Sequence, residues 1–395
     1  MLSKIDVNLD VIDQCEADMN WLTADEALAR LGTKPQTLYA NVSRGRITAR
    51  PDPSDPRKSL YRQDDVERLA SRRQGRRPAR IVAAESIAWG EPVLETAIST
   101  ISADQLLYRG EDAVKLAETA TLGAAARLLW ASDERPDFAN RAQARQPGIA
   151  AAYRAMAELA ATAMPTSGRH RAVLLEDAAL VVSFLSGALA APGSDPLHER
   201  LARQWQRRDA ADPLRRALVL LAEHELNAST FAARVTASTG APLAAAVLSG
   251  LAALSGPLHG NASQSMAGLV DQAQRLGADA AIAAHLRQGG ALPCFGHRLY
   301  AKGDARAATL LAAFTVPQVF AELAMAGERL TGEKPNIDFA LAAMTAAFGL
   351  PDDAPLQVFA LARSVGWIAH ALEQVETGTL IRPRARYTGP RPQIS

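Results

Sequence analysis

Long runs of alanine and leucine dominate the chain after about residue 88, and they constrain its fold more than any other feature. Hydrophobic residues make up 48% of the 395-residue chain but aromatic residues only 5%, so aliphatic side chains supply most of the apolar content. Ala and Leu are strong helix formers. We therefore expect a mainly α protein with an all-helical body, with helices at about 112–131, 138–163, 172–190, 195–208 and 211–224.

Two shorter patterns refine this expectation. The β-prone runs 95–100 and 106–110 predict a hairpin ahead of the helices. Near the C-terminus, apolar residues recur at spacings of four and three and form one helical stripe: Leu361, Val365, Ile368, Leu372 and Val375. Arg363 lies off this stripe, which favours a position facing a polar pocket.

Global charge and cysteine content exclude several classes of protein. The formal net charge is +1, so nothing in the whole chain points to nucleic acid or membrane. Cys15 and Cys294 cannot form a disulfide framework, and together with the lack of a signal-peptide pattern they favour the cytoplasm. The uncharged stretch 235–259 is long enough to span a bilayer. Its small residues and two prolines favour instead a helix buried against other helices, including at a subunit interface.

The N-terminal region has its own pattern. Residues 1–20 are expected to be a flexible lead-in. Thr23 and Glu26 form a predicted capping box, Gly32 ends that helix, and a second helix follows from about Pro35. Residues 44–80 hold 12 Lys or Arg and 5 Asp or Glu, a balance of +7, which is typical of a phosphate-contacting face.

Three segments carry a resemblance for this region: 22–27, 38–39 and 43–47. They resemble the MerR or excisionase type of winged helix-turn-helix. The resemblance implies a domain at 21–73, followed by a linker at 74–88, with DNA contact through residues 21–80. Such modules also serve in protein contacts, and both roles stay open.

Three histidines stand in unusual places. His224 opens a polar cluster, residues 224–230, between two apolar helices, so its members are expected to line a cavity or bond to one another. His259 follows a Gly-Pro stop and precedes a helix expected near Asn261. The helix dipole there disfavours the charged imidazole, so a neutral, hydrogen-bond-donating form is expected. His297 lies nine residues before Arg306 in a Gly- and Pro-marked loop, which suits an anionic, oxygen-bearing substrate.

Asp338 is the acid that stands out. It begins an apolar helix between Ile337 and Phe339. It is either an ordinary helix-start carboxylate or a desolvated base with a raised pKa. Cys294 close to His297 would allow a thiol nucleophile, but no orienting acid accompanies the pair.

Residues from about 89 to 390 resemble the citrate synthase family. The matching segments come in the family's order: 95–100, 108–110, 224–230, 256–260, 295–306, 335–339, 361–372 and 382–384. The resemblance implies a citrate synthase-like domain over 89–395, a helical homodimer, and a small domain at about 261–350 that closes over substrate. It implies a coenzyme A thioester as co-substrate, no permanently bound cofactor and no metal.

The resemblance also implies roles for single residues. Asp338 would take the methyl proton of acetyl-CoA, His259 would hydrogen-bond the thioester oxygen, and His297 would donate to the oxaloacetate ketone. The implied oxaloacetate ligands are His224, Arg306 and Arg363, and Arg382 would reach the site of the partner subunit. The implied reaction is condensation of acetyl-CoA with oxaloacetate to citrate and CoA.

Two alternatives stay open at this point. Propionyl-CoA would give 2-methylcitrate, because one extra methylene is decided by pocket shape. A DNA-binding regulator could instead use the citrate synthase fold as a ligand sensor. The chain departs from the usual family pattern at Asn261, Ser263 and Ala301, with Lys302 adjacent, and these positions bear on coenzyme A binding.

Overall fold

The computed structural model describes residues 21–67 and 94–389, apart from residues 34, 44–45, 54, 140–143, 261 and 386–387. It divides into two compact units, Met1–Glu95 and Thr96–Ser395, and each is described by itself. The expected lead-in (1–20), the expected linker (74–88) and Cys15 lie outside the described residues.

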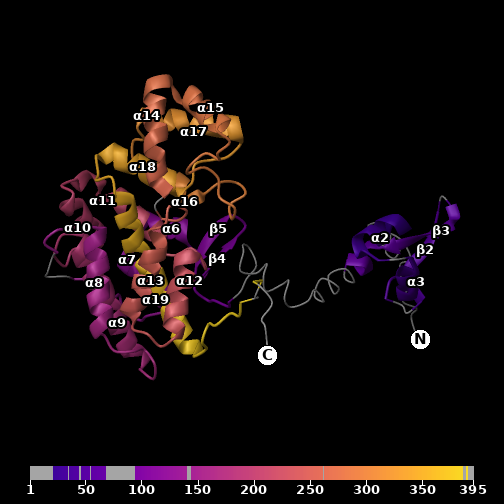
Figure 1. Cartoon of the computed structure of the whole chain (residues 1–395), viewed down its shortest axis with the longest axis horizontal. Coiled ribbons are helices and arrows are strands. Elements are labelled where there is room, and N and C mark those ends of the chain that lie inside the picture. Colours follow the sequence, from indigo (N-terminus) through magenta and orange to yellow (C-terminus); the bar gives the residue numbers. More distant parts are fainter. Residues whose placement is uncertain are drawn as a thin grey trace, which may run out of the picture. The chain divides into compact units, whose positions relative to one another are not determined.

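The N-terminal unit contains two helices and a three-stranded antiparallel sheet (Figure 1). Strand β3 lies between β1 and β2. The elements are β1 (Trp21–Leu22), α2 (Ala24–Leu31), α3 (Pro35–Ser43), β2 (Ala49–Asp52) and β3 (Asp55–Arg62).

The start and end signals predicted for the first helix of this unit are confirmed. Thr23 and Glu26 form the capping box, and Gly32 ends α2 in the left-handed conformation with φ 56°. A small core of its own holds the unit together: Leu22, Ala27, Leu31, Leu38, Ile47, Tyr61 and Val66. The winged helix-turn-helix class of this unit stays a prediction.

The second unit begins with the expected hairpin. Strands β4 (Ser99–Ser102) and β5 (Gln105–Tyr108) pair antiparallel, and β6 (Glu111–Asp112) extends the sheet beside β5. The connecting residues Ala103 and Asp104 have φ values of 51° and 62°. This left-handed pair matches the twist of a tight two-residue hairpin turn.

Helices form the rest of the second unit. The first group is α6 (Ala113–Thr119), α7 (Leu122–Leu129), α8 (Ile149–Thr162), α9 (Arg171–Leu189), α10 (Leu197–Gln204), α11 (Ala211–Leu221), α12 (Ala228–Ser238), α13 (Leu243–Leu254) and α19 (Ala354–Thr377). Two boundaries differ from prediction. The helix expected at 112–131 is interrupted where the Thr121 hydroxyl caps α7. The helix expected from 138 begins only at 149, after Gly148, whose φ is 142°.

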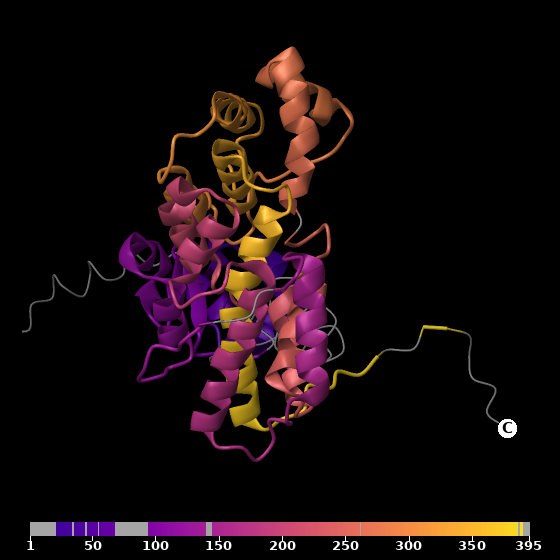
Figure 2. The ribbon, with the colours of Figure 1, turned by 90° about the vertical axis from the view of Figure 1, so that its left-hand side faces the viewer.

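Helix α19 is the central helix of this group. It packs against α7, α9, α11, α12 and α13, and Figures 1 and 2 show it running through their middle. Its residues are buried on all sides from Ala354 to Leu372. A helix surrounded in this way places any polar side chain it carries inside the protein, so Arg363 needs internal partners.

A second apolar cluster lies at one end of the unit, at the top of Figures 1 and 2. It is built mainly from α14 (Met266–Leu276), α15 (Ala278–Arg287) and α17 (Gln318–Thr331). Helix α18 (Ile337–Phe348) contributes Phe339 and Ala343 to this cluster and Ala340 and Leu341 to the main core. Helix α16 (Ala305–Leu311) packs on α18. The small-domain limits of about 261–350 stay a prediction.

The stretch 235–259 is not one long helix. It contains the end of α12, a turn, and α13, which packs against α8, α12 and α19, as expected for a small-residue helix buried among others. Within the described ranges, one helix is long and apolar enough to cross a membrane, namely α9, and half of its apolar window is buried.

Candidate active site

The turn between α11 and α12 carries His224. Glu225 in this turn has φ 51°, a left-handed value that a non-glycine residue adopts only when its surroundings hold it. The hairpin does so, because the Glu225 backbone N–H donates to the Ser99 hydroxyl at 3.1 Å and its carboxylate accepts the Ile101 N–H at 2.7 Å. The His224 ring is thereby fixed in a buried position.

His224 and His297 lie together. Their ring centroids are 5.1 Å apart, and the Tyr300 hydroxyl is 2.9 Å from His224 Nε2. Burial lowers the pKa of His224 well below 6.5, with Arg306 and Arg363 adding to the effect. Burial also lowers the pKa of His297 to about 4, helped by Arg306. Both imidazoles are therefore neutral at pH 7, so each can donate one hydrogen bond without carrying charge.

Arg306 is held by a buried carboxylate. Its Nε and Nη2 atoms donate to the two oxygens of Asp304 at 2.9 and 2.8 Å. Asp304 also caps α16 and accepts the Ile337 N–H at 3.1 Å, at the first residue of α18. Burial alone would lower the pKa of Arg306, but Asp304 raises it above its usual value, so the guanidinium stays charged. The face of Arg306 lies 5.2 Å from the Tyr300 ring centroid.

His259 approaches α12 and α19. Its Nε2 lies 2.8 Å from the Ser229 hydroxyl, which also accepts the Trp367 indole N–H at 3.1 Å. Burial lowers the pKa of His259 to about 4, and Arg363 contributes. The low pKa agrees with the expected neutral form, and burial is its largest cause. The helix expected near Asn261 begins as a 3-10 turn, Ala262–Ser265, which leads directly into α14 at Met266.

Asp338 is the second residue of α18. The cap of this helix is Asn336, whose side chain accepts the N–H groups of Asp338 and Phe339. One Asp338 oxygen, Oδ1, is buried and has no hydrogen-bond partner in the described part of the chain. Burial raises the pKa of Asp338 to about 6, although Arg306 opposes the rise. Asp338 thus lies in the first turn of α18 without capping it, and its carboxyl is desolvated. Its role as a base stays a prediction.

Arg363 connects these groups. It is 1% exposed, its Nε donates to the Leu221 carbonyl at 2.8 Å, and its guanidinium lies 4.9 Å from the Phe359 ring. Its charge lowers the pKa values of His224, His259 and Asp338. Residues far apart in the sequence therefore share one electrostatic environment.

Sequence reasoning missed several residues of this cluster. Ser229 and Tyr300 lie inside stretches that already stood out, and their hydroxyls next to predicted histidines were the available signal. Asp304 lies two residues before Arg306, a spacing that suits an ion pair. The thiol of Cys294 is buried, and burial together with Asp338 raises its pKa, which disfavours a nucleophilic thiolate.

The remaining predicted positions are Arg382 and the departures from the usual family pattern. Arg382 is exposed after α19, next to Ile381, whose N–H donates to the Ser238 hydroxyl at 3.1 Å. Ser263 is buried, and Ala301 and Lys302 are exposed. Asn261 lies outside the described residues.

Tyr300 thus lies next to His224, His297 and Arg306, and Ser229 lies next to His259. The charges of Arg306 and Arg363 both act on Asp338. A family model described as citrate synthase, C-terminal domain, matches residues 178–384, more than half of the chain. The chain belongs to the citrate synthase family. All the predicted site residues, His224, His259, His297, Arg306, Asp338, Arg363 and Arg382, lie within the matched range.

Individual citrate synthases and their relatives agree with this family. "Citrate synthase 2" of Bacillus subtilis is 39% identical over 45% of this chain and 51% of its own length. "2-methylcitrate synthase 1" of Corynebacterium glutamicum is 37% identical over 46% of this chain and 51% of its own. The chain thus spans about half the length of the curated relatives it matches.

The fold comparison extends further along the chain. A citrate synthase of Thermoplasma acidophilum, solved as a ternary complex with carboxymethyl coenzyme A and oxaloacetate, aligns with a TM-score of 0.63. The alignment covers 77% of this chain and 96% of that one at 24% identity. At this identity the likeness shows the fold, and it includes the region ahead of residue 178.

Proposed function

We propose that this protein condenses acetyl-CoA with oxaloacetate to form citrate and CoA. The observation that carries the proposal is the state of Asp338. Its side chain is half-buried, its Oδ1 is buried with no hydrogen-bond partner among the described residues, and its pKa is raised to about 6. It shares its electrostatic environment with three neutral imidazoles and two buried arginines. A base of this strength is ionised at pH 7 and strong enough to take a proton.

Each proposed step follows from the state of one side chain. Asp338 takes the proton from the acyl methyl group, while neutral His259 donates a hydrogen bond to the thioester oxygen as the enol forms. The enol carbon then attacks the oxaloacetate ketone, and His297 donates to the developing hydroxyl. Hydrolysis of the resulting thioester releases CoA. Arg306, Arg363 and His224 would hold the dicarboxylate through charge-assisted hydrogen bonds.

The test is release of free thiol from acyl-CoA by the purified full-length protein with oxaloacetate. Acetyl-CoA is expected to be the better substrate, and a higher kcat/KM for propionyl-CoA would assign the protein as a 2-methylcitrate synthase instead. Asp338→Asn should lose at least about 10²-fold in kcat. A folded protein that turns over neither thioester would contradict the proposal.

We also propose that two copies associate through α9. Three large apolar side chains on this helix are 41–48% exposed: Val173, Leu180 and Phe184. Val173, Leu180 and Phe184 are spaced by seven and four residues, so they share one helix face. A second copy of the same helix would cover this face by two-fold symmetry. In such a dimer Arg382 of each subunit would serve the partner's site.

We propose nucleic-acid contact for the N-terminal unit as a second activity. Helix α3 exposes Gln36, Thr37 and Tyr39, the last with 57% exposure, and Arg46 is exposed just after the helix. Polar and aromatic side chains on one helix beside basic residues suit a groove and its phosphates. Full-length protein should bind its own upstream DNA with an affinity that falls with salt, and Arg46→Glu should weaken it. Indifference to DNA at low salt would contradict this role.

A further inference from the structure

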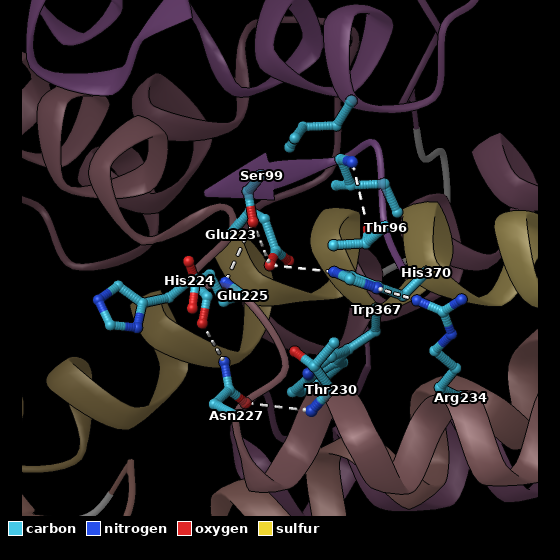
Figure 3. A network of polar contacts seen from close by, with 12 residues as sticks. Thr96, Ser99, Glu223, His224, Glu225, Asn227, Thr230, Arg234, Trp367 and His370 are labelled. Carbon is cyan, nitrogen blue, oxygen red and sulfur yellow. Dashed lines mark hydrogen bonds and ion pairs between the residues drawn. The ribbon is translucent and has the colours of Figure 1, made fainter. Parts of the chain in front are cut away.

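Glu223 is a fully buried carboxylate directly before His224, and the proposed reaction steps do not use it. Its Oε1 accepts the Ser99 hydroxyl and the His370 Nε2–H, each at 3.2 Å. Its Oε2 is buried without a hydrogen-bond partner in the described part of the chain. Figure 3 shows this carboxylate pointing toward His370 while the His224 ring points the other way.

The partners of His370 fix its proton. Arg234 Nη1 lies 3.2 Å from His370 Nδ1, and a guanidinium can only donate, so Nδ1 accepts. His370 must then carry its proton on Nε2 and donate it to Glu223. Arg234 is itself held by Glu373 at 2.9 Å and Gln374 at 2.8 Å. Hydrogen bonds therefore run from Arg234 to His370 and from His370 to Glu223, and the second bond holds Glu223 Oε1 in place.

The other oxygen of Glu223 faces α19. A Cβ atom added to Gly366 would lie closer than 3.0 Å to Glu223 Oε2 and to the Ala222 carbonyl oxygen. Gly366 follows Arg363 by three residues, so both lie on one face of the helix. Arg363 also donates to the Leu221 carbonyl, two residues before Glu223. The end of α11 and the turn after it are thus fastened to α19 at Arg363 and at Gly366.

We propose that Glu223 is a positioning residue: held by Ser99 and His370, it fixes the turn that carries His224 and supplies the buried negative charge that orients Arg363 for oxaloacetate. This inference rests on the proposed function, because it assigns Arg363 and His224 to oxaloacetate. The absence of a side chain at Gly366 is what lets the carboxylate reach this position.

The charges around Arg363 agree with this role. Burial lowers the pKa of Arg363 to about 10, and Glu223 is the strongest charge that opposes the fall. Six other charged or titratable groups interact electrostatically with Arg363: Tyr108 of β5, Tyr300, Arg306 of α16, His224, His259 and Asp338. Without Glu223, less negative charge would offset the effect of burial on the pKa of Arg363, so Arg363 would lose its proton at a lower pH.

The test compares Glu223→Gln with Glu158→Gln in the full-length protein. Glu223→Gln keeps the shape of the side chain and removes its charge, whereas Glu158→Gln removes an exposed carboxylate from α8. We expect the alkaline fall of kcat/KM for oxaloacetate to begin about one pH unit or more lower in Glu223→Gln. We expect KM for acetyl-CoA in Glu223→Gln, and the whole pH profile of Glu158→Gln, to match those of wild type.

Two further measurements distinguish a failure of the positioning role from a failure of the proposed reaction. Gly366→Ala keeps the charge of Glu223 but displaces the carboxylate, so it should also raise KM for oxaloacetate; circular dichroism and Tm establish that each variant is folded. Oxaloacetate binding by calorimetry at pH 7.5 and 9.5 needs no turnover. Wild type that binds oxaloacetate without turnover would refute the proposed reaction but not the positioning role. Folded Glu223→Gln with the pH dependence of wild type, or wild type that does not bind oxaloacetate, would overturn the inference.

Discussion

The hydroxyl of Ser229 lies 2.8 Å from the Nε2 atom of His259. The same hydroxyl accepts the Trp367 indole N–H and donates its single proton to Asn227 Oδ1 at 2.8 Å. In this arrangement His259 donates its Nε2 proton to the hydroxyl. Turning the hydroxyl proton from Asn227 to His259 Nε2 would place the imidazole proton on Nδ1, the form in which that nitrogen can donate to a thioester oxygen. The orientation of the Ser229 hydroxyl is thus linked to which nitrogen of His259 is the donor.

Ser229→Ala should lower kcat by about tenfold or more, because the tautomer of His259 is no longer fixed. KM for oxaloacetate should change little, since Ser229 does not contact the arginines. Ser249→Ala is a matched control, because the Ser249 hydroxyl pairs with Thr236 rather than with His259. Steady-state kinetics on both variants check this. Equal kcat values in the two would show that Ser229 does not direct His259.

The dependence of activity on pH should have one acid limb near pH 6. Asp338 must be ionised to act as a base, and its pKa is about 6. His259 and His297 have pKa values of about 4, so neither titrates between pH 5 and 8. A profile of kcat/KM for acetyl-CoA from pH 5 to 9 reports the free-enzyme groups. Full activity retained down to pH 5 would contradict the assignment of Asp338 as the base.

Asp338→Asn should stabilise the protein at neutral pH while abolishing activity. The folded-state pKa of about 6 lies above the reference value of 3.8, so the folded protein binds the proton more tightly. The contribution of this carboxyl to stability is present in full below the unfolded-state pKa and is lost as pH rises through about 6, at about 1.4 kcal/mol for each pKa unit. Asparagine avoids this loss.

Calorimetric Tm values at pH 4 and pH 8 check the prediction. The variant should gain more over wild type at pH 8 than at pH 4. Asp352→Asn, at an exposed carboxyl before α19, should show the same Tm difference at both values. A gain that does not depend on pH would mean that asparagine stabilises the site for a reason other than charge.

Oligomeric state should depend on the exposed face of α9. Leu180→Asp and Phe184→Asp place charge where the second copy is proposed to pack, so light scattering should show monomers. The monomers should also lose activity, because Arg382 is proposed to act in the partner's site. Met325→Asp, at a 66% exposed position on α17, is the control and should remain dimeric. A monomeric wild type would contradict the proposed interface.

The sequence predicted features that depend on near neighbours or on unusual polarity. Thr23 with Glu26 identified a helix start, and the polar cluster at His224 identified a buried turn. The sequence could not predict which residues tertiary packing brings into contact. Glu223 meets Ser99 and His370 across 124 and 147 residues of chain, and no local pattern encodes those distances. The contacts that bury His259 were out of reach for the same reason, because Ser229 in α12 and Phe359 in α19 lie far from it in the sequence.

Close packing around Trp367 yields a prediction for stability alone. A Cβ atom at Gly250 in α13 would lie 2.6 and 2.7 Å from atoms of the Trp367 ring, and that ring is fully buried. Alanine normally stabilises a helix interior by about 1 kcal/mol relative to glycine. Overpacking against a fixed ring costs about 1–3 kcal/mol, so Gly250→Ala should be destabilising overall.

Gly268 in α14 provides the comparison for this change. A Cβ atom there would meet nothing within 4 Å, and the residue is exposed. Gly268→Ala should therefore show only the propensity gain and raise the free energy of unfolding by about 0.5–1 kcal/mol. Urea unfolding of both variants measures the difference. If Gly250→Ala were as stable as Gly268→Ala, α13 and α19 would have to separate easily, and the ring of Trp367 could not hold the Ser229 hydroxyl in place.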